Sequence, residues 1–256
     1  MRIISWNVNG IRAVQKKGLL DWLQKEQPDF LCLQETKAEP QQLNEELLNV
    51  PGYTAYWSSA EKKGYSGTAI YTKFKPLNVQ HGFGIQRFDS EGRAVIAEYK
   101  DFTLLNIYFP NGKKNQDRLN YKMDFYAATL DYCRELQKKG REVIICGDVN
   151  TAHKEIDLAH PRENENTSGF LPMERAWIDS LLANGFVDTL RQFHTEDRLY
   201  TWWDYRTSSR ERNTGWRIDY FFVTEKLASK LKDAFILADV TGSDHCPLGI
   251  EIDVKG

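Results

Sequence analysis

The sequence lacks the features of several protein classes that are easily recognised. It has no continuous apolar run of about 18 residues, which a membrane-spanning helix requires, and no apolar secretory segment at its N-terminus. Lysine and arginine number 34 against 36 aspartate and glutamate residues, so the net charge is −2 and a histone-like basic coat is excluded. We therefore expect a protein of a cytoplasmic, bacterial-type compartment with no membrane partner, in which nucleic acid would bind through a local patch.

Thiol and nucleotide-binding motifs are also scarce. The chain has 4 cysteines and no Cys-x-x-Cys pair, so we expect reduced cysteines in or near the core. It has no glycine-rich loop of the type that cradles ATP or GTP phosphates, and no Gly-x-Ser-x-Gly elbow. Nucleotide triphosphate hydrolysis and serine-esterase chemistry are therefore disfavoured.

Strand-like and helix-like segments alternate along the chain, and no linker divides it. Helices are expected over 11–26, 41–48, 115–138 and 172–182. Strands are expected over 2–8, 29–34, 53–58, 67–73, 93–100, 102–108, 142–146, 217–223, 235–240 and 248–254. Helix-linked strands and hairpins coexist, which predicts mixed sheets covered by helices in a single domain over residues 1–256.

Three of the expected buried strands end abruptly in polar residues. Asn7 follows the first strand, Glu35 the second, and Asp148 and Asn150 the strand over 142–146. Ligand sites in layered α/β folds gather at the carboxyl ends of strands, so these side chains could form one cluster. Each residue alone is better explained as a turn or helix cap, but three such strand ends together favour a site.

The C-terminal third adds two acidic residues and a histidine. Asp219 interrupts an apolar strand, where an unpaired carboxylate is costly, so it needs a partner. That partner is either Arg217 or another residue, as structural compensation, or it is His245, which Asp219 would then orient. Asp244 and His245 lie together in a loop that is either a solvated turn or part of the site.

The chemistry of this residue set favours one kind of metal. It contains carboxylates, amides and a single histidine, without paired thiols or clustered histidines. Zinc prefers histidine and cysteine, whereas Mg²⁺ prefers oxygen ligands and needs few carboxylates when the substrate supplies phosphate. The residues therefore point to metal-dependent hydrolysis of a phosphate ester.

Seven motifs that follow one another in order carry a family resemblance. They are WNVNG at 6–10, LQETK at 33–37, YSGTA at 65–69, YFPNG at 108–112, GDVN at 147–150, WRIDY at 216–220 and SDH at 243–245. In this series the chain resembles the exonuclease III family of abasic-site DNA repair endonucleases, within the endonuclease/exonuclease/phosphatase superfamily. The resemblance implies a DNase I-like, four-layer α/β sandwich of two mixed β-sheets packed face to face with helices outside.

The resemblance also implies an activity. It would be Mg²⁺-dependent cleavage on the 5′ side of an abasic site, with Mn²⁺ as a substitute, leaving a 3′-hydroxyl. Relatives often add 3′-phosphatase, 3′-phosphodiesterase and 3′→5′ exonuclease activity. The expected partner is double-stranded DNA with an abasic site or a blocked 3′ end, bound by a monomer.

Site roles follow from the resemblance by motif position. Glu35 would be the main metal ligand, supported by Asn7 and Asp244, and Asp148 would activate or orient the attacking water with help from Asn150. The groups expected to contact the scissile phosphate are His245, paired with Asp219, together with Tyr108 and Asn111. The identity of the general base and the number of metals stay open.

Substrate contacts are expected from aromatic and basic residues. By the family pattern, Trp202, Trp216 and Ile218 would line an apolar pocket for an extrahelical abasic sugar, while Trp203 is better explained as core packing. Asn164 would contact phosphate or form a local turn. Local basic groups, of which Lys114 is the best candidate for a phosphate contact, occur at Lys62-Lys63, Lys113-Lys114, Arg206, Arg210 and Arg212.

Three alternative functions share this fold. The protein could be an exonuclease specific for 3′ ends, a superfamily phosphodiesterase with another substrate, or a catalytically silent DNA-binding scaffold. The scaffold is disfavoured because the site residues are all intact, and unpaired buried charges would cost stability. These residues are Glu35, Asp148, Asn150, Asp219, Asp244 and His245.

Overall fold

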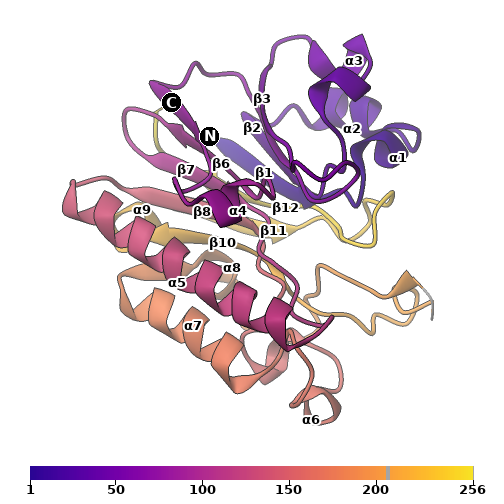
Figure 1. Cartoon of the computed structure of the whole chain (residues 1–256), viewed down its shortest axis with the longest axis vertical. Helices are drawn as coiled ribbons and strands as arrows, with labels where there is room; N and C mark the ends of the chain where they lie inside the picture. Colours follow the sequence, from indigo (N-terminus) through magenta and orange to yellow (C-terminus); the bar gives the residue numbers. More distant parts are fainter. Residues whose placement is uncertain (206–207, 256) are drawn as a thin grey trace.

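The computed structural model describes residues 1–205 and 208–255 and contains two six-stranded β-sheets (Figure 1). Arg206, one of the basic residues named above, lies outside the described residues. The first sheet has the strand order β11-β12-β1-β2-β4-β3. Its strands are β1 (Arg2–Asn7), β2 (Phe30–Gln34), β3 (Thr54–Ser58), β4 (Thr68–Thr72), β11 (Leu231–Ile236) and β12 (Leu248–Ile252).

The second sheet has the order β5-β6-β7-β8-β10-β9. Its strands are β5 (Asn78–His81), β6 (Ala94–Glu98), β7 (Thr103–Ile107), β8 (Val143–Asp148), β9 (Phe186–Asp188) and β10 (Asp219–Thr224). In each sheet one pair is parallel, β1 with β2 and β7 with β8, and the other pairs are antiparallel. Both sheets are therefore mixed, as the sequence predicts.

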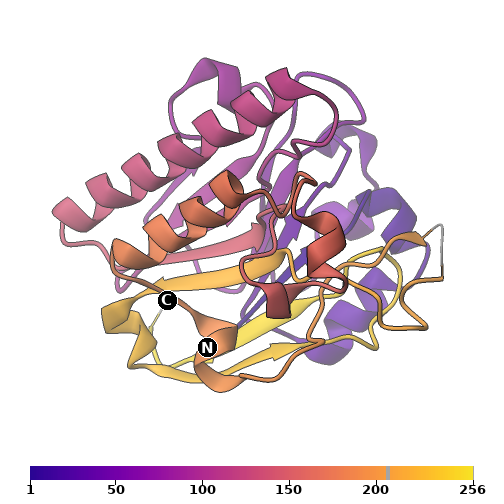
Figure 2. The same cartoon turned by 90° about the horizontal axis from the view of Figure 1, so that it is seen from below.

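Most of the helices lie on the outer faces of the two sheets. Figure 1 shows α5 and α7 on one side of the molecule and α1, α2 and α3 on the other, and Figure 2 shows α5 and α7 lying side by side. The helices are α1 (Ile11–Gln15), α2 (Leu19–Glu26), α3 (Glu45–Leu48), α4 (Gln86–Asp89), α5 (Gln116–Lys138), α6 (Pro161–Asn164), α7 (Pro172–Ala183), α8 (Thr189–Phe193) and α9 (Glu225–Ala228), with 3₁₀ turns η1 (Pro40–Gln42) and η2 (Glu155–Asp157). None of these helices is both long and apolar enough to cross a membrane.

Alternation along the strands produces the layers. In β1, Ile3 packs with Phe30 and with Leu104 and Ile144 of the second sheet, whereas the next residue, Ile4, packs with the outer helices. In the strands of the second sheet, successive side chains likewise alternate between the face toward the first sheet and the face toward α5 and α7. This arrangement confirms the expected four-layer sandwich.

Three expected elements differ from the structure. The helix predicted over 11–26 is two helices, because Gly18 adopts a left-handed conformation with φ of 94° between them. The helix predicted over 41–48 is the turn η1 followed by α3, separated by extended backbone at Leu43 and Asn44. The strand predicted over 235–240 begins earlier, at Leu231, and ends at Ile236. The short strands β5 and β9 were not predicted.

The four cysteines, Cys32, Cys133, Cys146 and Cys246, are buried and free, as expected. Burial in the apolar core raises the pKa of the Cys133 thiol to about 12. A buried thiol of this kind behaves as a small apolar side chain.

Candidate active site

The polar strand ends meet in one pocket of about 230 Å³. Its position follows from the topology, because β1 and β2 are parallel neighbours and end together, while β8 ends where β10 begins. The lining residues are Asn9, Glu35, Tyr108, Asn111, Lys113, Asp148, Asn150, Gly169, Trp202, Trp216, Ile218, Asp244 and His245. Most of the predicted site residues are therefore brought together.

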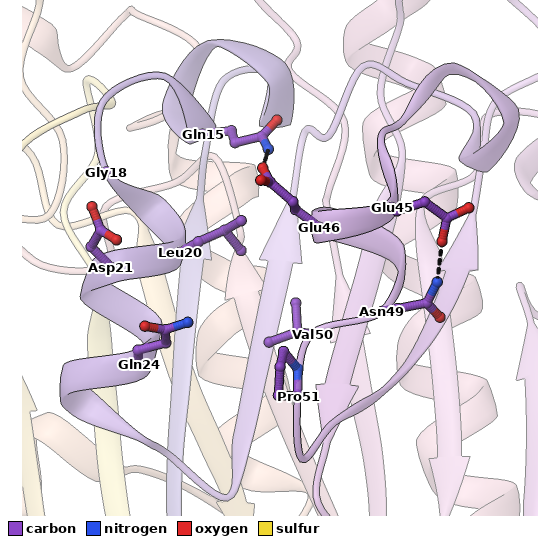
Figure 3. Close-up of a pocket in the computed structure, with 10 residues that line it drawn as sticks. All are labelled: Gln15, Gly18, Leu20, Asp21, Gln24, Glu45, Glu46, Asn49, Val50 and Pro51. Carbon is purple, nitrogen blue, oxygen red and sulfur yellow. Dashed lines mark hydrogen bonds between the residues drawn. The ribbon is translucent and has the colours of Figure 1, made fainter.

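A larger hollow of about 610 Å³ lies between α2 and α3, and Figure 3 shows its lining. Its walls carry the carboxylates of Asp21, Glu45 and Glu46 around Leu20 and Val50. None of the residues predicted for the site lines it, so the smaller pocket is the candidate active site.

Asp219 is paired with His245. Its Oδ2 atom lies 2.8 Å from Nδ1 of His245 and accepts a hydrogen bond of 2.6 Å from the hydroxyl of Thr201. Arg217 instead forms buried ion pairs with Asp157 and Asp188, both at 2.7 Å. Of the partners that the sequence left open for Asp219, the structure selects His245.

This pairing keeps the imidazole charged. Burial alone would disfavour a charge on His245, but the carboxylates of Asp219, Asp148 and Asp244 outweigh it and raise its pKa to about 10. His245 is therefore an imidazolium at neutral pH, with its Nε2 directed to the Asp148 side, 3.9 Å from Oδ2 of Asp148.

Asp148 lies at the centre of the cluster and is almost completely buried. Its Oδ2 accepts a hydrogen bond from the Asn7 amide at 2.9 Å, and its Oδ1 accepts one from the backbone N–H of Asn150 at 2.8 Å. Burial first, and then the nearby charge of Asp219, raise its pKa to about 7, although His245 opposes this. A carboxylate with this pKa can gain or lose a proton near neutral pH.

Asn7 links the two strand ends from behind. Its amide nitrogen donates to Glu35 at 3.1 Å as well as to Asp148, and its oxygen accepts from the backbone of Asn9 at 3.0 Å. Asn7 is fully buried and does not line the pocket. The structure therefore places it as a brace between two carboxylates.

Two residues that the sequence analysis did not single out hold the carboxylates of Asp244 and Glu35. Asn9 donates to Asp244 at 2.9 Å, and the Lys37 ammonium lies 2.9 Å from Oε1 of Glu35. Both stand in the WNVNG and LQETK motifs, which was the available signal. Asn9, Glu35 and Asn150 adopt left-handed φ values of 46°, 57° and 56°, so each strand end turns sharply with strain at the site.

The first and last strands are also joined here. The Trp6 indole donates to the carbonyl of His245 at 3.0 Å, and the Ser243 hydroxyl donates to the carbonyl of Asn7 at 2.8 Å. These contacts fix the loop that carries Asp244 and His245 against the end of β1.

Tyr108 is held by Arg93, another residue that the sequence analysis did not single out. The buried Arg93 guanidinium donates to the Tyr108 carbonyl at 3.0 Å and lies 4.9 Å from the centre of its ring. Burial, with the charges of Glu35 and Asp148, raises the Tyr108 pKa, so its phenol remains a proton donor.

The other wall of the pocket is aromatic. The rings of Trp202 and Trp216 lie 6.5 Å apart, nearly perpendicular, and the Trp202 indole donates to Asp244 at 3.1 Å. Ile218 completes this wall. Trp203, in contrast, packs with Tyr200 and Cys246 in a buried cluster, which confirms the core interpretation.

Two predicted DNA contacts are not brought to the pocket. Lys114 is exposed and does not line it, whereas its neighbour Lys113 does. The Asn164 amide donates to the carbonyl of His160 at 2.9 Å, across the short helix α6, which is the local-turn alternative.

The donors of the pocket fit a hard divalent cation. Asp148, Asp219 and His245 have donor atoms within 4.8 Å of one another, but Asp219 and His245 already bond to each other. The carboxylates that line the pocket are Glu35, Asp148 and Asp244. Glu35 already binds one cation, the ammonium group of Lys37. Oxygen donors of this kind suit Mg²⁺ or Mn²⁺ better than zinc.

A model of the Endonuclease/Exonuclease/phosphatase family matches residues 4–245. The chain belongs to this family. Among its members, the chain is 45% identical to an exodeoxyribonuclease of Bacillus subtilis, over 99% of this chain and 100% of that protein. It is 42% identical to the DNA repair nuclease APEX1 of Danio rerio, over 99% of this chain and 83% of that protein. The resemblance to exonuclease III-type hydrolases is therefore confirmed.

Solved structures of family members agree. A 3′ phosphatase, NExo, from Neisseria bound to a product DNA hairpin is 30% identical, with a TM-score of 0.92 over 99% of this chain and 100% of that one. An AP endonuclease from Archaeoglobus fulgidus is 32% identical, with a TM-score of 0.89 over 99% and 100% of the two chains.

Proposed function

We propose that this protein is a Mg²⁺-dependent DNA repair phosphodiesterase that cuts on the 5′ side of abasic sites and leaves a 3′-hydroxyl. One observation carries the proposal, namely that a charged His245–Asp219 pair and the carboxylate of Asp148 share one small pocket with an aromatic wall. Charged groups are expected where a phosphodiester reacts, and an apolar wall where a sugar without a base is bound.

The reacting phosphate would meet fixed hydrogen-bond donors. The imidazolium of His245, the phenol of Tyr108 and the Asn111 amide would stabilise the charge that develops on the phosphoryl oxygens. Asp148 would accept a proton from the attacking water, and Asn150 would hold Asp148 through the backbone hydrogen bond described above.

Glu35 and Asp244 would hold the metal, with Asn7 orienting Glu35 from behind. When bound, Mg²⁺ would supply Lewis-acid charge stabilisation at the phosphate, and Mn²⁺ would serve as a substitute. The Lys37 ammonium and the metal ion would compete for the Glu35 carboxylate, so the ion pair between Lys37 and Glu35 would break when the metal binds.

The sugar would lie against Trp202, Trp216 and Ile218. The same pocket would accept a 3′-terminal phosphate or sugar fragment, which supports additional 3′-phosphatase, 3′-phosphodiesterase and 3′→5′ exonuclease activity. The relatives support both kinds of activity, since they include an exodeoxyribonuclease, an AP endonuclease and a 3′ phosphatase bound to product DNA. We further propose that the protein acts as a monomeric single domain over residues 1–256 in the cytoplasm.

The test compares two labelled duplexes with Mg²⁺. One carries a single tetrahydrofuran abasic analogue, and the other is undamaged with a recessed 3′ end. A single cut on the 5′ side of the analogue, abolished by EDTA and by Asp148→Asn, is expected. Binding of Asp148→Asn to the same duplex should persist, because the substitution removes a charge and keeps the shape of the side chain.

Other outcomes would point to the alternatives. A ladder from the recessed 3′ end without the internal cut would identify a 3′-end exonuclease. Binding of the analogue duplex without any cleavage would favour a silent scaffold. If the protein neither binds nor cleaves either duplex, another phosphodiester substrate would be favoured.

A further inference from the structure

Lys113 lines the pocket, yet the proposed hydrolysis gives it no role. Its ammonium nitrogen lies 5.3 Å from the ring centres of both Trp202 and Trp216. Ammonium groups are attracted to aromatic faces at this distance. The amine therefore occupies the wall against which the abasic sugar is proposed to lie.

The loop between β7 and α5 fixes this position. The backbone N–H of Lys113 donates to Oδ1 of Asn111 at 2.8 Å. A Cβ atom on Gly112 would lie 2.5 Å from the Ser168 hydroxyl, so the loop packs closely against Ser168 at this glycine. From this loop Lys113 lines the pocket, whereas Lys114 does not.

The surroundings favour a reactive amine. Among the described residues, no carboxylate forms an ion pair with Lys113. Desolvation by the pocket walls lowers the pKa of Lys113, although the charges of Asp204, Glu174 and Asp148 oppose this. Lys113 is nevertheless exposed and lines the pocket, so it is accessible to a bound molecule. Lysines in such places act as nucleophiles toward carbonyl groups.

An abasic deoxyribose supplies the matching carbonyl. The sugar exchanges between a closed hemiacetal and an open form with an aldehyde at C1′. A primary amine and an aldehyde condense to an imine and water. The tetrahydrofuran analogue has no such aldehyde and cannot take part.

We propose that Lys113 forms a covalent imine with C1′ of a ring-opened abasic sugar and gives the protein a metal-independent lyase activity beside hydrolysis. The bond between Nζ and C1′ forms, and the aldehyde oxygen leaves as water with both amine protons. The C2′ proton then passes to solvent, the C3′–O bond breaks, and the 3′ phosphate leaves with the electron pair. Water hydrolyses the remaining imine and frees Lys113. This inference rests on the proposed function, because it places the sugar in the same pocket.

The experiment uses the whole protein, a duplex with one natural abasic site, EDTA to stop hydrolysis, and borohydride to reduce the imine to a stable amine. We expect a protein–DNA adduct that peptide mapping assigns to Lys113. Lys113→Arg keeps a cation against the tryptophans but lacks a nucleophilic amine, so the adduct yield should fall at least about tenfold. The neighbouring Lys114→Arg is the matched control and should keep its yield per bound DNA.

Several results would overturn the inference. These are no adduct with the unaltered protein, an undiminished yield in Lys113→Arg, or an adduct that maps to another lysine. An unchanged melting temperature of Lys113→Arg shows that the variant is folded. Mg²⁺-dependent cleavage of the tetrahydrofuran duplex, which cannot form the imine, tests the proposed function separately.

Discussion

Asp148 lies directly opposite Asp219 in the register of the antiparallel strands β8 and β10. Two carboxylates at this spacing would repel one another, and the imidazole of His245, 2.8 Å from Asp219 and 3.9 Å from Asp148, relieves the repulsion. The titrations of Asp148 and His245 are therefore linked, since the charge of Asp148 raises the pKa of His245 and the charge of His245 lowers that of Asp148.

The first prediction concerns the pH dependence of hydrolysis. Asp148 must be ionised, and its raised pKa of about 7 means that kcat/KM should fall as the pH decreases through that value. His245 must be protonated, so kcat/KM should fall as the pH increases through about 10. Initial rates on the tetrahydrofuran duplex at fixed Mg²⁺ and ionic strength give the profile, and a rate independent of pH between 5 and 8 would contradict the role of Asp148.

The second prediction concerns the positioning role of Asp219. Asp219→Asn should lower kcat by about 10²- to 10⁴-fold, with little change in DNA binding, and should move the basic limb of the pH profile toward the ordinary histidine value. His153 and Asp179 form a second histidine–carboxylate pair, also at 2.8 Å, outside the pocket. Asp179→Asn is therefore a matched control that should leave the profile unchanged, and equal effects of the two variants would remove Asp219 from the mechanism.

The third prediction concerns the metal. Glu35→Gln keeps the size of the side chain and removes its charge, so half-maximal activity should require at least about tenfold more Mg²⁺. Glu45→Gln, on the exposed rim of the larger hollow, is the control. A Glu35→Gln variant with an unaltered Mg²⁺ titration would exclude this carboxylate from the metal site.

The fourth prediction concerns stability. Lys122 and Glu174 form a completely buried ion pair at 2.6 Å, and Lys122 also donates to the carbonyl of Asn150 at 2.8 Å. Glu174→Ala leaves a buried ammonium group without its partner and should lower the free energy of unfolding by about 3–5 kcal/mol. Denaturant titration measures the change. Glu135→Ala, which removes an exposed carboxylate from its pair with Lys138, is the control and should change the free energy of unfolding little.

The sequence was sufficient to predict the site residues that lie at the ends of strands. Asn7, Glu35 and Asp148 could be predicted because polar residues recur at the ends of three apolar strands, and the order of the motifs supported them. The partner of Asp219 could not be chosen from the sequence, since Arg217 and His245 were both plausible and only the packing of β10 separates them.

Other features depend on details that local sequence patterns do not carry. The break at Gly18 was missed because apolar positions continue through it with helical spacing. Lys113 and Lys114 are chemically the same, and only the path of the loop between β7 and α5 shows that Lys113 lines the pocket and Lys114 does not. Arg93 was missed because arginine is usually exposed, and its burial depends on the partner Glu91, 2.6 Å away.

The hydrogen bonds from Trp6 to His245 and from Ser243 to Asn7 join parts of the chain more than 230 residues apart, with sequence separations of 239 and 236. Contacts this distant form slowly, because the entropy of closing so long a loop opposes them. A ribosome-bound chain that has not yet released its last strand therefore carries Glu35 and Asp148 but no imidazole beside them. The site proposed to cut DNA is therefore assembled only when the segments around Trp6 and His245 have met.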